Sequence, residues 1–208
     1  VPTTIEFVDI AGLVKDAHTG EGLGNKFLSH IREVDAIVHV VRFFEGSDII
    51  HIHNKVDPQS DAETINTELA LADLETVQKC MQSAEKTAKG QGADAKLATA
   101  QIAALKKIEA HLEQGLPARD VELTEKESEL IQTSSLLTNK PMMYVANVSD
   151  PAYAKASAGK EISEQNESFE QQFGKILPLS IQIEQEIAQL SPEEQTIFLA
   201  EYGLEDTG

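Results

Sequence analysis

Apolar positions in the first forty-one residues predict a strand, a helix and a second strand. Residues 4–10 (TIEFVDI) are rich in β-branched and aromatic side chains and run into Ala11 and Gly12, which predicts a buried strand ending in a turn. Residues 36–41 (AIVHVV) form the nearly continuous apolar run typical of a parallel strand covered on both faces. The apolar positions between these two runs have helical spacing: Leu23, Phe27, Ile31 and Val34. We therefore expect a strand–helix–strand unit with a right-handed crossover.

The middle of the chain predicts two long helices. Residues 63–89 contain neither Gly nor Pro, and their apolar positions recur about three or four residues apart, which predicts a helix about 40 Å long. Residues 90–92 (GQG) interrupt this pattern, which then resumes over residues 98–112. Two such helices joined by a short Gly-rich turn predict an antiparallel helical hairpin.

Alternation of strands and helices resumes after the hairpin. Thr124 and Glu127 have the spacing of a capping box, which predicts a short helix through Ile131. Residues 142–148 (MMYVANV) predict a further buried strand. The remaining patterns predict a helix over 161–173, a strand over 176–180, and helices that begin near 182 and 192. The whole pattern favours an α/β fold with a mostly parallel sheet, interrupted by the helical hairpin.

Charge and composition narrow the classes of partner. The chain has 208 residues and a net charge of -18, which disfavours a broad basic face and direct binding to DNA. Residues 85–107 are the exception, because they hold five lysines against two acidic residues. A lone Cys80 excludes an intramolecular disulfide, and no apolar run approaches the roughly 18 residues of a membrane span. These features predict a soluble, cytoplasmic protein without a membrane partner.

Two short motifs follow predicted strands and have both functional and ordinary interpretations. Asp9 and Gly12 form a D-x-x-G pattern, in which the carboxylate could organise a Mg²⁺ shell and the glycine amide could reach a terminal phosphate. Asn147 and Asp150 have the N-x-x-D spacing that holds a purine base. Both motifs also consist of ordinary turn residues at strand ends. The chain contains no G-x-x-x-x-G-K-[ST] phosphate loop, and residues 20–24 predict a switch segment or a plain glycine loop.

The order of four segments resembles the YchF/Obg-like ATPase family of translation-factor-related P-loop NTPases. The segments are FVDIAGLV, GEGLGNKFLSHIREVDAIVHVVRFFE, TINTELALADLE and KPMMYVANVSD. The resemblance implies a partial P-loop NTPase domain over residues 1–60 and 136–208, and a coiled-coil-like insertion over 61–135. It also implies a P-loop segment before Val1 and a TGS domain after Gly208, so that the chain is expected to be an internal fragment.

The resemblance also implies roles for individual residues. Asp9 and Gly12 would belong to the second switch, with Asp9 supporting Mg²⁺. Asn147 and Val148 would contact the nucleotide base. Ser180 and Ile181 would lie in the last base-side loop.

Two positions bear on catalysis and on base preference. Leu13 cannot orient a water molecule as the glutamine of many GTPases does, so the resemblance implies that His51 takes this task. Asp150 stands where the family usually has Glu, so ATP is the expected nucleotide while GTP remains open.

The sequence supports two hypotheses of function. The first is an ATP-hydrolysing regulatory switch that associates with the ribosome, with the hairpin lysines as a candidate contact. The second is a non-catalytic interaction module that presents the hairpin to a ribosomal or protein partner. The 208 residues themselves are expected not to hydrolyse nucleotide, because they lack the P-loop groups.

Overall fold

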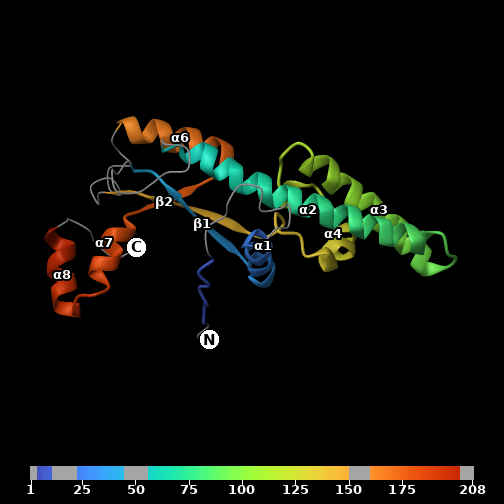
Figure 1. The fold of residues 1–208 in the computed structure, drawn as a ribbon, viewed down its shortest axis with the longest axis horizontal. Helices are drawn as coiled ribbons and strands as arrows, with labels where there is room; N and C mark the ends of the chain where they lie inside the picture. Colours follow the sequence, from blue (N-terminus) through green and yellow to red (C-terminus); the bar gives the residue numbers. More distant parts are fainter. Residues whose placement is uncertain (1–3, 11–22, 45–55, 150–159, 202–208) are drawn as a thin grey trace. The chain divides into compact units, whose positions relative to one another are not determined.

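The computed structural model describes residues 4–10, 23–44, 56–149 and 160–201, which fall into two compact units. We call the described residues within 1–37 and 63–141 the helical unit, and those within 38–62 and 142–208 the sheet unit. Along the chain (Figure 1) the elements are α1 (Leu23–Glu33), β1 (Ile37–Arg42), α2 (Pro58–Ala88), α3 (Ala93–Leu112), η2 (Ala118–Asp120), α4 (Glu125–Ile131), η3 (Gln132–Ser134), β2 (Met142–Asn147), α6 (Lys160–Phe173), β3 (Ile176–Leu179), α7 (Ile181–Ile187) and α8 (Pro192–Glu201).

Helix α2 begins at Pro58, earlier than the residue 63 expected from the apolar pattern. The Asp57 carboxylate accepts a hydrogen bond from Ser60 N at 3.1 Å, which satisfies one of the free amides of the first turn. Pro58 occupies the first helical position, where its missing N–H has no helical partner to lose. The helix therefore starts at a capped turn that the apolar spacing does not show.

The helical unit is held by a core that α2, α3 and α4 share. Its buried residues are Ala70, Val77, Ala104, Leu105, Ile108, Leu112, Ala118, Ile131 and Leu136. The predicted capping box of α4 is confirmed, since Glu127 N donates to Thr124 Oγ1 and Thr124 N donates to the Glu127 carboxylate. Gly92 precedes α3 and has a φ of 98°, which residues other than glycine rarely adopt. The two long helices predicted from the sequence are present, whereas their role as an inserted hairpin stays a prediction.

A buried carboxylate fastens the segment after η3 to α2. Asp73 is fully buried, and its two oxygens accept hydrogen bonds from Leu137 N at 2.8 Å and from Thr138 N and Thr138 Oγ1, both at 2.7 Å. Thr138 Oγ1 in turn accepts from Ala118 N at 3.0 Å. Burial raises the pKa of Asp73, and the hydrogen bonds from Thr138 and Leu137 and the charge of Arg32 oppose that rise.

The sheet unit contains a three-stranded sheet in the order β1-β2-β3. Strands β2 and β3 are parallel, with Tyr144 opposite Ile176 and Asn147 opposite Leu179. One face packs on aromatic side chains that include Phe169 and Phe173 of α6. Together with the helices this confirms the predicted α/β class and the parallel sheet.

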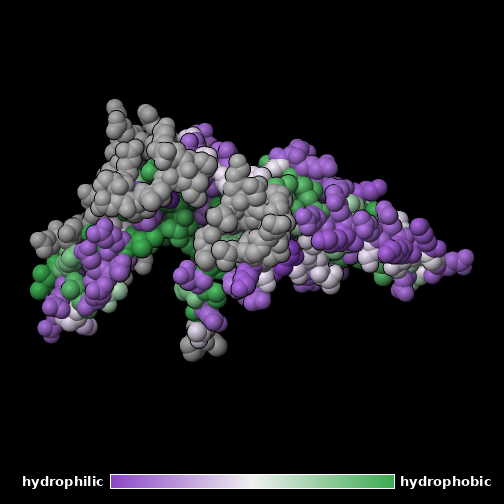
Figure 2. Space-filling model, in the orientation of Figure 1, coloured by the Kyte–Doolittle hydropathy of each residue, from purple (hydrophilic) through white to green (hydrophobic). Residues whose placement is uncertain are grey.

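Two expectations about the strands are wrong. Residues 4–10 form no strand, and their apolar side chains are exposed, Ile5 by 74% and Phe7 by 83%. A strand needs a neighbour for its backbone hydrogen bonds, and the described residues give this segment none, so the predicted strand–helix–strand unit is not formed. Strand β1 was expected to be covered on both faces, but Val38 and Val40 are 44% and 49% exposed. Figure 2 shows apolar atoms, coloured green, on the surface of the described residues.

Candidate functional site

The candidate site lies at the carboxyl ends of β2 and β3 in the sheet unit. Asn147 is the last residue of β2, and Ser180 follows β3 as the N-cap of α7. Because parallel strands end at the same edge of a sheet, the register of Asn147 opposite Leu179 brings these two strand ends together. Four of the residues predicted from the sequence therefore lie at one place: Asn147, Val148, Ser180 and Ile181.

Hydrogen bonds connect the two strand ends. Asn147 Oδ1 accepts from Ile181 N at 3.4 Å, and Val148 N donates to Leu179 O at 3.0 Å. On the other side, Phe43 N donates to Asn147 O at 2.9 Å, which joins the same residue to the segment after β1. The Asn147 side chain thus helps to fix the first residue of α7.

The remaining polar groups of this cluster differ in what they can offer a ligand. Ser180 is 4% exposed, and within the described part of the chain its Oγ has no hydrogen-bond partner. Val148 is buried, so its side chain belongs to the core and only its backbone could face a ligand. Amide and hydroxyl groups at a strand edge can recognise the polar edge of a planar heterocycle by hydrogen bonding.

Comparison with known proteins identifies what the chain is similar to. A family profile described as "50S ribosome-binding GTPase" matches residues 2–83. The chain is 47% identical over 208 residues to "Ribosome-binding ATPase YchF" of Bacillus subtilis, covering 100% of this chain and 56% of that protein. It is 41% identical over 198 residues to "Obg-like ATPase 1" of Saccharomyces cerevisiae, covering 93% of this chain and 50% of that protein. The chain belongs to the YchF/Obg-like ATPase family.

A solved structure supports the YchF/Obg-like fold. The "Schizosaccharomyces pombe YchF GTPase" matches with a TM-score of 0.74 and 30% sequence identity, over 90% of this chain and 51% of that one. The chain spans about half the length of the relatives that it matches. The resemblance inferred from the sequence motifs is thereby confirmed.

The other predicted site residues of this YchF/Obg-like chain are not part of the strand-end cluster. Asp9 lies in the helical unit, in the exposed segment 4–10. Gly12, His51 and Asp150 lie outside the described residues.

Magnesium was expected from the resemblance, and the described residues do not form a site for it by themselves. Asp9 supplies one exposed carboxylate. Within the described ranges no group of three or more His, Cys, Asp or Glu side chains could hold a metal ion. Mg²⁺ therefore stays a prediction for this chain.

Among the described residues, no helix has both the length and the apolar character that crossing a membrane requires.

The sequence motifs did not point to two ionisable residues, Asp73, which is buried, and His39, which is half-buried. Asp73 stands within the apolar stripe of α2, and a charged residue among apolar positions is the signal that could have drawn attention to it. His39 lies in β1 with its ring centroid 5.4 Å from that of Tyr144. Burial lowers the pKa of His39 to about 4, and the charge of Asp61 opposes that change. His39 is therefore a neutral side chain of the sheet unit at pH 7.

Proposed function

We propose that this chain is part of a ribosome-associated switch protein that binds and hydrolyses ATP. The hydrogen bond between Asn147 Oδ1 and Ile181 N carries the proposal, because it joins two predicted base-side positions at one sheet edge. The 47% identity to a relative named "Ribosome-binding ATPase YchF" supports the same function. In this proposal Asn147, Val148, Ser180 and Ile181 receive the base.

The remaining roles follow the sequence motifs. Asp9 would support Mg²⁺ and Gly12 would reach the terminal phosphate, while His51 would position the attacking water because Leu13 cannot. A water-positioning group acts mainly in the transition state. We therefore expect His51→Ala, in the protein as its gene encodes it, to lower kcat with little change in ATP affinity.

Base preference is tested by calorimetry on the protein as its gene encodes it. Adenine presents an N6 donor and an unprotonated N1, so it offers Asp150 no pair of adjacent donors, and we expect ADP to bind more tightly than GDP. Tighter binding of GDP that Asp150→Ala abolishes would show a GTPase instead. Asn147→Ala should weaken both nucleotides, whereas the matched control Asn139→Ala, at an exposed position of the helical unit, should leave both affinities unchanged.

The ribosome is the proposed macromolecular partner, which would place the protein in the cytoplasm. The lysines near the α2–α3 turn supply positive charge on an acidic chain. We expect charge reversal at Lys86, Lys89 and Lys96, all exposed, to weaken co-sedimentation with ribosomes, most steeply at low salt. Sedimentation equal to that of the parent protein would remove this contact.

A non-catalytic interaction module is the second candidate function. It is favoured by the exposed lysines of the helical unit. Ribosome binding that is identical with ATP, with ADP and without nucleotide would favour this module over the switch.

A further inference from the structure

The helical unit has a groove lined by η2, by residues 121–123, and by α4 and η3. Its volume is about 430 Å³. The apolar part of its lining comes from Ala118 and Ile131, which are buried, and from Val121 and Leu123, which are half-buried and pack on the core of the unit. We call this hollow the α4 groove. An open groove with an apolar lining can hold the aliphatic part of a long side chain while the polar end of that side chain stays in water.

Two carboxylates of α4 line the same groove. Glu125 and Glu129 are four positions apart on this helix, so they lie on one side of it, and Ser128 lines the groove with them. Both glutamates are exposed, and among the described residues neither carboxylate has a hydrogen-bond or ion-pair partner. Glu127 differs, because its carboxylate lies 2.7 Å from Lys107 Nζ. The charges of Glu125 and Glu129 are therefore free to bind a cation from outside the described residues.

The wall opposite these carboxylates is held in place by hydrogen bonds. Arg119 lines the groove, and its backbone N and its guanidinium both donate to Thr138 O, at 3.3 Å and 3.2 Å. Thr138 is fixed in turn by the buried Asp73, and its Oγ1 accepts from Ala118 N at 3.0 Å. A wall that is already ordered loses little conformational entropy when a ligand binds. Two carboxylates against one guanidinium leave the lining with one net negative charge.

The segment between η2 and α4 presents free backbone groups. It is extended at both ends, with φ and ψ of -76° and 125° at Val121 and of -70° and 159° at Thr124. Among the described residues, the backbone N–H and C=O groups of Glu122 and Leu123 have no backbone partners. Adjacent residues of an extended chain direct these groups to opposite edges, so one of the two can pair with another extended chain. Such pairing is a common way to bind a peptide.

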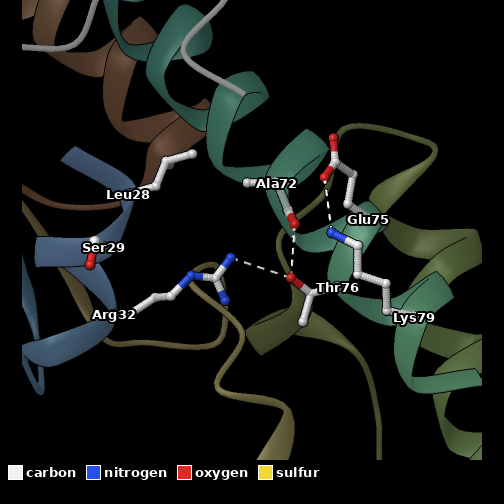
Figure 3. A pocket seen from close by; sticks show the side chains of 7 residues that line it. All are labelled: Leu28, Ser29, Arg32, Ala72, Glu75, Thr76 and Lys79. Atoms are coloured by element: carbon white, nitrogen blue, oxygen red, sulfur yellow. Dashed lines mark hydrogen bonds and ion pairs between the residues drawn. The ribbon is translucent and has the colours of Figure 1, made fainter. Parts of the chain in front are cut away.

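The charge around the α4 groove favours a basic ligand. Residues 117–132 contain five acidic residues and two basic ones. A second groove of the helical unit, between α1 and α2, has the opposite sign, because Arg32 and Lys79 line it together with Glu75 (Figure 3). The two grooves therefore favour ligands of opposite charge.

We propose that the α4 groove binds an extended, lysine-containing segment of a partner protein. The backbone of that segment would pair with Glu122 or Leu123, and a lysine side chain would enter the groove. The methylene groups of this lysine would lie on Val121 and Leu123, and its ammonium, which has three donors, would bind Glu125 and Glu129. The charge of the lysine complements the net negative charge of the lining. This site goes beyond the proposed nucleotide binding, and it is separate from the lysines near the α2–α3 turn.

The test measures binding of a labelled nine-residue peptide, in which lysine and threonine alternate, to the protein as its gene encodes it, by fluorescence anisotropy. Glu125→Gln combined with Glu129→Gln removes two charges at nearly constant size, so it should weaken binding at least fivefold at low salt. The matched control combines Glu75→Gln with Glu85→Gln, which makes the same change at exposed positions of α2 and should leave binding unchanged. Equal binding by the α4 double variant and the parent protein, or an equal loss in the control, overturns the proposal.

Glu129→Gln alone keeps the test decisive even if loss of the Glu125 charge weakens the first turn of α4. Glu129 lies in the last turn of this helix, where a negative charge does not stabilise the helix, so its removal should leave α4 folded. This single variant should bind the peptide at least twofold more weakly than the parent protein does. Binding equal to that of the parent, or equally tight binding of a peptide with glutamate in place of lysine, overturns recognition by the carboxylates.

Pairing of the backbone is tested separately from charge. The same peptide with every backbone nitrogen methylated keeps its lysine charges and loses its N–H donors, so it should bind at least fivefold more weakly. The unmethylated peptide should slow hydrogen exchange at the amide of Glu122 or of Leu123. Equal binding of the two peptides, or unchanged exchange at both amides, would reduce the contact to attraction between charges and overturn the proposal.

Discussion

Asp73 is the residue whose removal should destabilise the helical unit most directly. Its carboxylate accepts three hydrogen bonds from Leu137 and Thr138, so Asp73→Ala leaves two buried backbone amides without partners. We expect the free energy of unfolding to fall by about 2–4 kcal/mol, measured by urea denaturation. Asp35→Ala, at an exposed position, serves as the control and should change it by less than about 0.5 kcal/mol. Equal stability of the two variants would contradict the role of this buried carboxylate.

His39 should make stability depend on pH. Its pKa is lowered to about 4 in the folded chain, mainly by burial, from about 6.5 in an unfolded one. As pH falls, the His39 side chain therefore takes up a proton in the unfolded chain at a higher pH than in the folded chain. Protonation favours the unfolded chain, so the folded chain loses stability as pH falls from about 6.5 toward 4. Between pH 7 and pH 5 this loss should amount to about 2 kcal/mol.

His39→Phe tests this pH dependence, because it keeps a ring against Tyr144 and removes the titrating group. The difference between the urea-unfolding free energies at pH 7 and pH 5 should shrink by about 2 kcal/mol in the variant. His30→Gln, at an exposed position of α1, should retain the parent's difference. A variant with the parent's full pH dependence would assign that dependence to other groups.

At the scale of elements, the turn before α3 depends on Gly92. A Cβ added there meets no atom within 4 Å, so the penalty of substitution comes from the φ of 98° alone. We expect Gly92→Ala to lower the free energy of unfolding by about 1–2 kcal/mol, measured by thermal or urea unfolding. Gly92→Asn should lose about as much as Gly92→Ala, because φ of 98° with ψ of -158° lies outside the left-handed helical region that Asn tolerates. Stability equal to that of the parent chain in both variants would argue against backbone strain at this position.

Local patterns predicted the helices well and the strands unevenly. The run without Gly or Pro and the capping box of Thr124 are properties of neighbouring residues, so α2 and α4 could be expected from the sequence. Residues 4–10 have equally strong strand composition, but a strand also needs a hydrogen-bonded neighbour, which composition cannot reveal. The same reason hides Asp73, whose partners Leu137 and Thr138 are 64 and 65 residues away.

The candidate site was predictable to the extent that it follows strand ends. Asn147 and Ser180 end apolar runs, and the parallel register of β2 and β3 brings them to one edge. The hydrogen bond from Ile181 N to Asn147 Oδ1 could not be inferred from either motif alone, since it depends on that register. Their binding of a nucleotide base remains a prediction, as do the roles of Asp9, Gly12, His51 and Asp150.

At the scale of the whole molecule, we expect the 208-residue chain by itself to hydrolyse no measurable ATP. Phosphoryl transfer relies on P-loop amides, a P-loop lysine and a metal held by a P-loop hydroxyl, and the sequence contains no such motif. The measurement compares phosphate release by this chain with release by the protein as its gene encodes it. A comparable rate in both would contradict the dependence on the P-loop.

The order of the sheet has a consequence for how the chain folds. The backbone hydrogen bond from Phe43 N to Asn147 O joins residues that are 104 positions apart in the sequence. Helices α3 and α4, by contrast, pack on each other through residues that are about thirty positions apart or fewer. Closing the longer loop costs more chain entropy and is the slower event in folding. We therefore expect amides of α3 and α4 to gain protection from hydrogen exchange before those of β1 and β2. The edge of the sheet that carries Asn147 would then be among the last parts of the protein to form during synthesis.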